Sequence, residues 1–202
     1  MSVKRRVKAG NWTPEGAAER AAWRRDFREL TPIQRVEQVF ELSRFLSQLA
    51  QAGPGDAIHE IHTQAILREL VDEGVEFLLA GAVAAGYHGY IRGAAELDVV
   101  PALDPDNLQS LKRVIEQLDA RVEGDLRQDS PIFATRLGRI HVMQRIGDFH
   151  LWEELSPAAI DDFIGDLPIK IASYEDLVRL KELTGRPEDL ADLQRLREAR
   201  ES

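Results

Sequence analysis

Residues 77–101 read FLLAGAVAAGYHGYIRGAAELDVVP, and we expect the fold to be organised around them. An apolar run ends in Ala80-Gly81-Ala82, and the stretch closes on a second apolar run that contains Glu96 and Asp98. Side chains alternate between the two faces of a strand, so these two carboxylates are expected on one face. Carboxylates held side by side repel each other, whereas hard divalent cations bind such oxygens well. The pattern therefore predicts a metal and nucleotide-phosphate site, or the remnant of one. The alternative is a pair of exposed acids on an edge strand.

The length and composition indicate a globular protein. A chain of 202 residues can form one domain with a core plus an extension. Its 44% hydrophobic and 30% charged residues are typical of soluble proteins, and no run approaches the roughly eighteen apolar residues of a membrane span. The absence of cysteine excludes disulfides and thiolate metal sites. We therefore expect a cytoplasmic protein that does not contact a membrane.

Charge is distributed unevenly along the chain. Residues 1–28 contain eight Lys or Arg residues and three acids, so they carry about +5, whereas the whole chain carries -9. The remaining residues therefore carry about -14. Such a basic arm would suit nucleic acid or an acidic protein partner. A solvated tail is the alternative.

The first helix is predicted over residues 31–50. Thr31 can cap it, Pro32 suits its first position, and apolar residues recur at helical spacing. Gly53-Pro54-Gly55 then interrupts the chain. We therefore divide the chain into a basic arm with an amphipathic helix, residues 1–52, and a domain with C-terminal helices, residues 56–202.

The second part alternates helices and strands. This order predicts an α/β (α+β) fold, with a small mixed sheet flanked by helices and an N-terminal helical extension. A hairpin is expected with its turn at Gly138-Arg139. The predicted helices are 56–73, 83–89, one from Asp104-Pro105, 173–183 and one from Pro187, and the predicted strands are 75–79, 96–101, 132–137, 140–144 and 168–172.

Two segments resemble the nucleotidyltransferase superfamily typified by DNA polymerase beta. That family combines a Gly-containing turn with an acid-hydrophobic-acid-hydrophobic strand, matched here by Ala80-Gly81-Ala82 and Glu96-Leu97-Asp98-Val99. His88-Gly89 followed by Arg92, and residues 171–196 with a lysine and an Arg-Pro-x-Asp-Leu-x-Asp pattern, are similar to its small bacterial members. These are the AbiEii-type toxins and the minimal nucleotidyltransferases. The resemblance covers roughly residues 66–196.

The resemblance implies both an activity and a set of site residues. It implies transfer of an NMP group from NTP to a hydroxyl on RNA, protein or a small molecule, in a toxin–antitoxin or phage-defence setting. Mg²⁺ (or Mn²⁺) would be bound by Glu96 and Asp98. The backbone at Gly81 and Ala82, with the side chains of Arg92 and Lys181, would contact the phosphates. A cognate antitoxin or another protein would bind through the N-terminal arm.

The sequence departs from the family pattern at three positions. Ala82 replaces a glycine or small polar residue, and Glu96 is one methylene longer than aspartate. The third acid is replaced by His141, in Ile140-His141-Val142. A neutral imidazole can bind a metal or act as a base, but it lacks the charge that would hold a second Mg²⁺. Asp148 would serve instead if the register were shifted.

These departures leave two functional hypotheses open. One is an active enzyme, with Glu96, Asp98 and His141 as catalytic residues. The other is a catalytically degenerate binding or regulatory module with the same fold.

Some of the charged residues also have purely structural interpretations in place of a role in the site. Arg92 would pair with Glu96, and Lys181 would be a solvated helix lysine. The residues Arg186, Asp189 and Asp192 are expected to form a network of caps and ion pairs between the last two helices.

Overall fold

The computed structural model describes residues 29–51, 62–123 and 129–201. The chain divides into two compact units, Met1–Thr31 and Pro32–Ser202, and all the helices and strands described below belong to the second. The basic arm predicted over residues 1–28 and most of the predicted break after residue 52 lie outside the described residues. Within the described ranges, no helix is long and apolar enough to cross a membrane.

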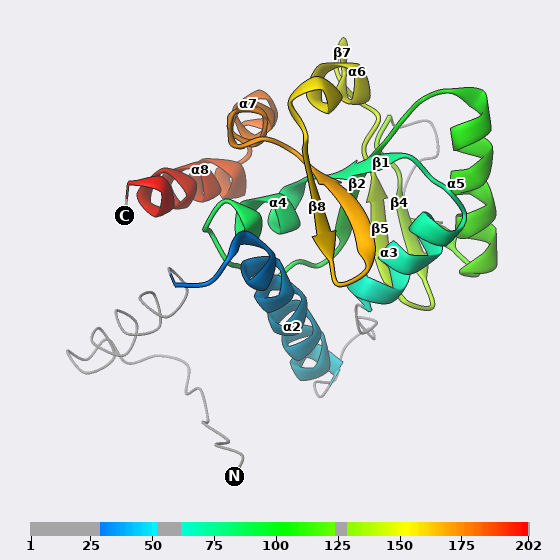
Figure 1. Cartoon of the computed structure of the whole chain (residues 1–202), viewed down its shortest axis with the longest axis horizontal. Coiled ribbons are helices and arrows are strands. Elements are labelled where there is room, and N and C mark those ends of the chain that lie inside the picture. Colours follow the sequence, from blue (N-terminus) through cyan, green and yellow to red (C-terminus); the bar gives the residue numbers. More distant parts are fainter. Residues whose placement is uncertain (1–28, 52–61, 124–128, 202) are drawn as a thin grey trace. The chain divides into compact units, whose positions relative to one another are not determined.

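A mixed seven-stranded sheet forms the centre of the second unit (Figure 1). Its strand order is β3-β4-β5-β2-β1-β9-β8, with β1 and β2 antiparallel, and with β1–β9 and β2–β5 parallel. A separate two-stranded ribbon, β6–β7, follows β5 in the chain. The strands are β1 (Phe77–Leu79), β2 (Leu97–Pro101), β3 (Arg121–Glu123), β4 (Ile132–Thr135), β5 (Gly138–Val142), β6 (Arg145–Ile146), β7 (Phe149–His150), β8 (Ile160–Ile164) and β9 (Leu167–Ile171).

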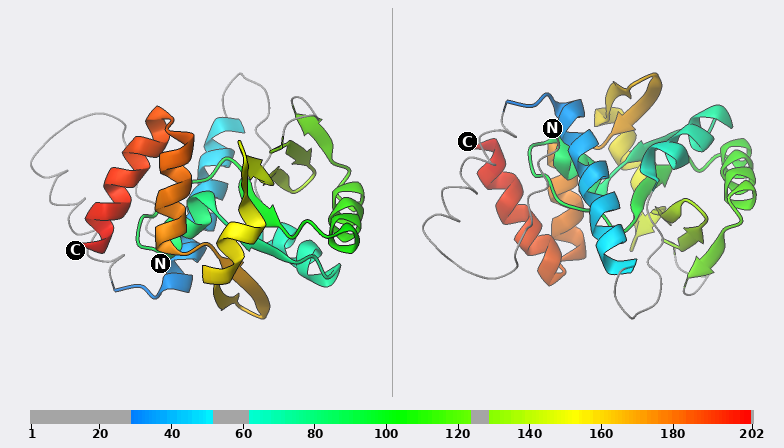
Figure 2. Two further views of the ribbon diagram at one scale, coloured as in Figure 1. Left: turned by 90° about the horizontal axis from the view of Figure 1, so that it is seen from above. Right: turned by 90° about the horizontal axis from the view of Figure 1, so that it is seen from below.

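Helices flank the sheet, and α7 and α8 lie side by side (Figure 2). Helix α2 packs on α4, while α3 and α5 pack on each other and against strands of the sheet. The described helices are α2 (Pro32–Gln51), α3 (Thr63–Asp72), α4 (Gly81–Tyr87), α5 (Pro105–Gln117), α6 (Leu151–Leu155), a short 3-10 helix (Ser156–Ala158), α7 (Tyr174–Thr184) and α8 (Pro187–Arg200).

The core lies on both faces of the central strands. All three residues of β1 are buried, as expected for a strand covered by helices on both sides. Each fully buried aliphatic side chain contributes about 1.5–3 kcal/mol through removal of apolar surface from water. In β2 the buried side chains of Leu97 and Val99 alternate with the partly exposed Asp98. The packing of the core therefore fixes which way the carboxylate of Asp98 points.

The predicted α/β class is confirmed, and several helix ends match their local signals. Ser173 accepts a hydrogen bond from the Asp176 amide at the start of α7, and Pro187 opens α8. The predicted helix 56–73 is wrong at His62, which is not helical and precedes α3 as its N-cap, while residues 56–61 lie outside the described part. Strand β8, which the sequence did not predict, pairs with β9 at one edge of the sheet.

The predicted hairpin forms, but the predicted turn position is wrong. Thr135 pairs with Gly138, so the turn residues are Arg136-Leu137 rather than Gly138-Arg139. The Thr135 hydroxyl donates to the Gly138 carbonyl at 2.7 Å and accepts from the Leu137 amide at 3.0 Å. These two bonds close the turn two residues earlier than the glycine suggested.

Candidate metal and nucleotide site

The turn between β1 and α4 is built against Asp98. Gly81 has φ +53°, a left-handed conformation that side chains other than glycine rarely adopt. A Cβ atom at this position would overlap the Asp98 carboxylate. The Ala80 amide also donates to the Asp98 carbonyl at 3.1 Å. Gly81 is therefore needed both for the bend of the chain and for the space that the carboxylate occupies.

Glu96, Asp98 and His141 form a cluster at neighbouring strands. Their ligand atoms all lie within 4.8 Å of one another, and β2 pairs with β5 so that Asp98 is opposite His141. His141 thus lies beside the two acids, and its assignment to the third-acid position of the family pattern stays a prediction. Asp148 is exposed in the β6–β7 turn and does not belong to this cluster, so the shifted-register alternative is wrong.

A short hydrogen bond orients the His141 ring. Its Nδ1 lies 2.8 Å from Asp98 Oδ1. A carboxylate oxygen accepts, so Nδ1 carries a proton and donates, and in the neutral form of the ring Nε2 is the nitrogen with a lone pair. The ring is thus prepared to accept a proton or to bind a cation through Nε2.

The chemistry of the donor set fits a divalent cation. Two carboxylates and one imidazole are brought together from β5 and the start of β2, and each is only partly exposed. Carboxylates suit Mg²⁺ and Mn²⁺, and an imidazole ligand favours the transition metals over Mg²⁺. Arg139 Nη1 lies 3.5 Å from Glu96, while its Nη2 lies 2.7 Å from Glu123, so Glu96 shares its cationic partner with a second carboxylate.

Strand position excludes the edge-strand alternative for the two acids. Strand β2 lies between β5 and β1 inside the sheet. The alternative pairing of Arg92 with Glu96 is also wrong, because the Arg92 Nε donates to Asp192 at 3.1 Å and the partner of Glu96 is Arg139. Asp98 therefore lies in an interior strand, Glu96 directly precedes that strand, and both residues line a cavity.

A network of charges joins α7 to α8, as the sequence predicted. Lys181 Nζ lies 2.6 Å from Asp192 Oδ2 and 3.2 Å from Asp189 Oδ1. The Thr184 hydroxyl and the Arg186 Nε both donate to Asp189 Oδ2, at 2.7 and 2.8 Å. Lys181 is buried, so the alternative of a solvated helix lysine is wrong.

The network also determines the protonation of Asp189. Burial alone would raise the pKa of this carboxyl. The hydrogen bonds from Arg186 and Thr184, with the charge and hydrogen bond of Lys181, outweigh that effect and hold its pKa below the usual range. Asp189 is therefore an anion that links the buried Lys181 to Arg186.

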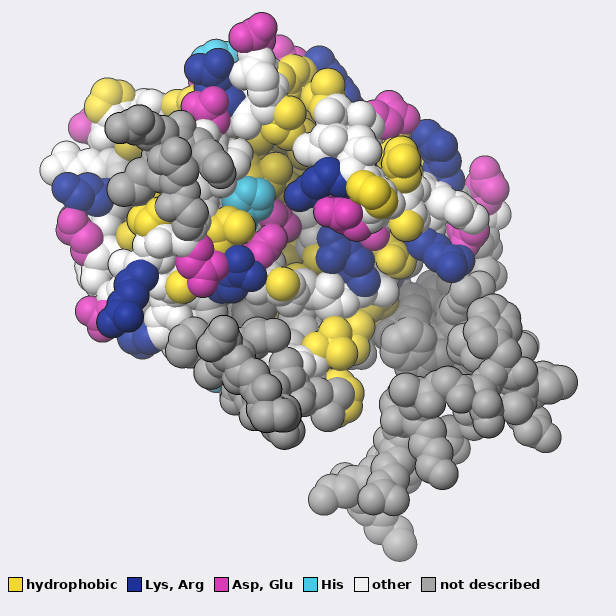
Figure 3. All heavy atoms as spheres, turned by 180° about the vertical axis from the view of Figure 1, so that it is seen from behind, with side chains coloured by type: hydrophobic (Ala, Val, Ile, Leu, Met, Phe, Trp, Pro, Cys, Tyr) yellow, Lys and Arg dark blue, Asp and Glu magenta, His cyan; other side chains and the backbone are white. Residues whose placement is uncertain are grey.

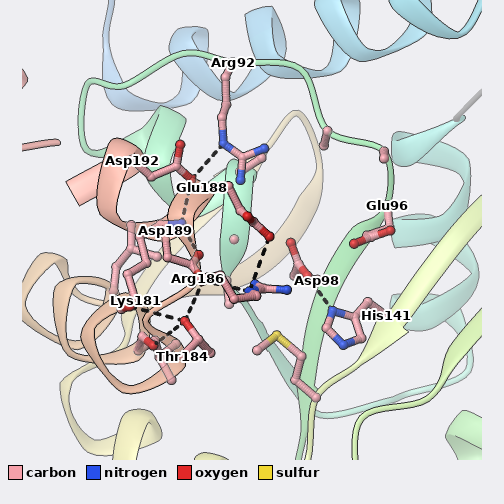
Figure 4. Close-up of a pocket in the computed structure, with 18 of the residues that line it drawn as sticks. Arg92, Glu96, Asp98, His141, Lys181, Thr184, Arg186, Glu188, Asp189 and Asp192 are labelled. Atoms are coloured by element: carbon pink, nitrogen blue, oxygen red, sulfur yellow. Dashed lines mark hydrogen bonds and ion pairs between the residues drawn. The ribbon is translucent and has the colours of Figure 1, made fainter. Parts of the chain in front are cut away.

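A cavity of about 370 Å³ separates the acidic cluster from this network (Figure 4). All seven predicted site residues line it, which brings together residues from five different elements and loops: Gly81, Ala82, Arg92, Glu96, Asp98, His141 and Lys181. Sequence reasoning assigned Arg186 only to the network, yet Figure 4 shows its guanidinium extending toward Asp98. The Arg-Pro start of α8 was the only signal that could have indicated it.

One face of the described part of the chain mixes both signs of charge. On the face drawn in Figure 3, acidic, basic and apolar side chains are interleaved, and a histidine lies in a recess among them. Such a mixture favours recognition inside a cavity over binding to a broad field of one sign.

Comparison with known proteins identifies the fold. The sequence matches no protein-family model and no curated protein. The structure is similar to that of the lincosamide antibiotic adenylyltransferase LnuA bound to lincomycin, with a TM-score of 0.52 and 13% identity over 68% of this chain and 97% of that one. The chain has a nucleotidyltransferase-like fold.

Two further nucleotidyltransferase-like structures are similar at lower scores. The antibiotic-resistance factor ANT(2'')-Ia in solution gives a TM-score of 0.49 and 11% identity, over 66% of this chain and 79% of that one. An antigenic nucleotidyltransferase-like protein from Paracoccidioides brasiliensis gives 0.46 and 16%, over 65% and 72%. The AbiEii-type assignment within the nucleotidyltransferases stays a prediction.

Proposed function

We propose that this protein transfers an NMP group from NTP to a hydroxyl group of an acceptor. The observation that carries the proposal is the Glu96–Asp98–His141 cluster, which faces cationic side chains across one cavity in a nucleotidyltransferase-like fold. Glu96 and Asp98 would hold Mg²⁺ or Mn²⁺. A bound cation there would neutralise phosphate charge and activate the acceptor hydroxyl.

The chain's own residues account for the remaining requirements of the reaction. The acceptor oxygen forms a bond to the α-phosphorus, the bond from that phosphorus to the bridging oxygen breaks, and pyrophosphate leaves. The hydroxyl proton passes to Nε2 of His141, whose Nδ1–H is held by Asp98. The free amides at Gly81 and Ala82, which begin α4, would contact the phosphates. Catalysis is then mainly positioning and electrostatic stabilisation.

The alternative is a binding or regulatory module that keeps the fold without the reaction. It is favoured by one observation, a histidine in place of a third carboxylate, because an imidazole provides less negative charge for a second metal ion. In this case NTP and metal would bind without transfer. The acceptor class, the toxin–antitoxin setting and a protein partner at the N-terminal arm remain parts of the proposal that rest on the sequence resemblance alone.

The test uses the full-length protein with each α-labelled NTP, Mg²⁺ or Mn²⁺, and a cell extract that contains RNA, protein and small molecules. Wild type is compared with Asp98→Asn and with Asp106→Asn, an exposed acid in the first turn of α5. We expect label transfer by wild type and Asp106→Asn only.

Binding measurements separate the two candidate functions. Without transfer, a rise in melting temperature with Mn²⁺ and NTP that Asp98→Asn abolishes would favour the binding module. Without either transfer or a rise in melting temperature, both functions fail.

A further inference from the structure

Three cationic side chains line the cavity: Arg92, Lys181 and Arg186. They differ in how many of their N–H groups already bind other groups of the protein. We infer that Arg186 is the side chain that binds the NTP phosphates, and that Lys181 positions it. The inference rests on the proposed function, because it assigns the phosphate contact within that same site.

The side chain of Lys181 is buried and already paired within the protein. Its side chain is only 6% exposed, and its ammonium group contacts both Asp189 and Asp192. To reach a phosphate, Lys181 would have to leave two buried carboxylates without their cation, which is strongly unfavourable. The structure therefore gives Lys181 a supporting position behind the cavity wall.

Arg92 uses part of its hydrogen-bonding capacity within the protein. Its Nε donates to Asp192 at 3.1 Å and its Nη1 to the Gly93 carbonyl at 3.1 Å, and its side chain is 34% exposed. These bonds direct much of its donor capacity toward the protein. Arg92 is thus a secondary candidate for a phosphate contact.

Arg186 has the most donor capacity directed at the cavity. Its side chain is 59% exposed, its Nε donates a hydrogen bond to Asp189 at 2.8 Å, and the same nitrogen lies 3.6 Å from Glu188. Figure 4 shows the guanidinium between Glu188 and Asp98. Both Nη groups are therefore presented to the space beside the metal-ligand cluster.

The local backbone explains this position. Gly185 ends α7 with φ +60°, a left-handed cap that glycine adopts readily, and Arg186 is the residue that caps α8. Its Nε bond to Asp189 fixes the plane of the guanidinium, and Asp189 is in turn held by Lys181 and Thr184. A guanidinium fixed at Nε leaves two parallel N–H donors, which match the spacing of phosphate oxygens.

The charges around the cavity indicate under which condition Arg186 would bind a phosphate. The cavity is lined by three cationic side chains and by five carboxylates: Glu96, Asp98, Glu188, Asp189 and Asp192. A triphosphate would therefore be repelled unless a metal ion neutralises the acidic wall. The charge of Asp98 contributes to raising the pKa of Arg186, after the larger effects of Asp189 and Glu188. Arg186 is thus placed to bind an anion that the metal brings next to Asp98.

The test measures nucleotide binding by titration calorimetry on the full-length protein with Mn²⁺. Affinities for ATP, ADP and adenosine are compared among wild type, Arg186→Gln, Arg186→Lys and the matched control Arg195→Gln. Arg195 lies on α8, pairs like Arg186 with an acid three residues on, and is 49% exposed, but it does not line the cavity. Thermal melting of each variant checks that it is folded.

We expect Arg186→Gln to weaken ATP binding about tenfold or more, as for loss of a hydrogen-bonded charge. Adenosine binding should be unchanged, Arg186→Lys should recover part of the loss, and Arg195→Gln should bind like wild type. Equal ATP binding by Arg186→Gln and wild type would overturn the inference alone, as would an equal loss for ATP and adenosine. Absence of nucleotide binding by wild type would overturn the proposed function and the inference together.

Discussion

Gly81 and Asp98 constrain each other across the first turn of the sheet. The positive φ of Gly81 lets α4 begin directly after β1, and its missing Cβ leaves space for the Asp98 carboxylate. A single residue therefore serves the backbone and the site at once. The two roles can be separated, because other glycines in the chain have a positive φ without any neighbour in the way.

Gly81→Ala should destabilise the fold and displace the Asp98 carboxylate. Gly165→Ala in the β8–β9 turn is the matched control, since its φ is +63° and nothing lies near its missing Cβ. The left-handed conformation should cost each variant about 1–2 kcal/mol in urea unfolding. Only Gly81→Ala should also lose Mn²⁺ affinity in calorimetry, and equal affinity in the two variants would contradict this account.

His141→Asp should change which metal the cluster prefers. A third carboxylate adds repulsion between acids when no cation is bound, and it replaces a nitrogen ligand by an oxygen ligand. We expect a lower melting temperature in EDTA, a larger rise on adding Mg²⁺, and a smaller preference for Mn²⁺. His141→Asn, which removes the ring without adding charge, should lose Mn²⁺ affinity without any gain for Mg²⁺. An equally large rise in melting temperature with Mg²⁺ in His141→Asn would show that the added negative charge of His141→Asp is not the cause.

Among the helices, α7 and α8 are joined by buried ion pairs. Lys181, Asp189 and Asp192 are all buried, and the hydrogen bonds of Arg92 and Arg186 extend the network to the cavity. Buried ions of opposite sign hold one geometry when each has its partners, and they destabilise the fold when one is removed. The cavity wall thus depends on this network.

Lys181→Met should destabilise the protein by about 3–5 kcal/mol, because two buried carboxylates lose their cation. The double variant Lys181→Met with Asp192→Asn removes one of those charges and should recover part of the loss. Urea unfolding of both variants measures the difference. A single variant as stable as wild type would show that the network does not hold the helices together.

The end of α4 is tied to the far strands of the sheet. The Tyr87 hydroxyl donates to Asp162 in β8 at 2.9 Å, and His88 Nε2 lies 2.8 Å from the Ala172 carbonyl, which accepts from it. Burial, with the smaller effect of the Asp162 hydrogen bond, raises the pKa of Tyr87 to about 12. Burial also lowers the pKa of His88, although its hydrogen bond opposes the shift.

Stability should fall as the pH is lowered from 7.5 toward 5.5, a window set around the ordinary histidine pKa of about 6.5. The folded protein binds a proton at His88 less readily than the unfolded chain, so acid favours unfolding in this window. His88→Gln should flatten the pH dependence measured by urea unfolding. His150→Gln, at an exposed position, should keep it. An unchanged slope in His88→Gln would exclude His88 as its source.

At the scale of the whole molecule, the packed core and the charged arm occupy different parts of the chain. The buried cluster is drawn from Val36 to Leu196 within the second compact unit. Residues 1–28 carry about +5 against a remainder of about -14. The described core and cavity therefore come from the acidic remainder of the chain.

Deleting residues 1–28 should leave the melting temperature and NTP binding unchanged. If the arm binds nucleic acid, as its charge predicts, the full chain should bind a duplex more tightly at low salt and lose that advantage steeply as salt rises. Fluorescence anisotropy of wild type and the truncated chain tests this. Equal affinities of the two proteins for nucleic acid would exclude the arm as a nucleic-acid contact.

Local signals determined the elements that the sequence could predict. Proline and serine at the starts of α5, α7 and α8 act within one turn of their own helices, so no distant residue was needed to interpret them. Strand β8 was missed because its Asp161 and Asp162 interrupt the apolar pattern. Its strand conformation depends on pairing with β9, which a local window does not contain.

The acidic side of the cavity follows from local sequence. The alternation of strand residues points the Asp98 side chain away from the core, Glu96 directly precedes the strand, and the β2–β5 register sets His141 opposite Asp98. The ion-pair partner of Arg92, by contrast, followed only from the packing of the helices. Arg92 and Asp192 are 100 residues apart in the chain, and their pairing depends on how α8 packs. The alternation of side chains along a strand is a property of the local backbone. The partner of a long charged side chain depends instead on which distant residues the packing of the fold places near it.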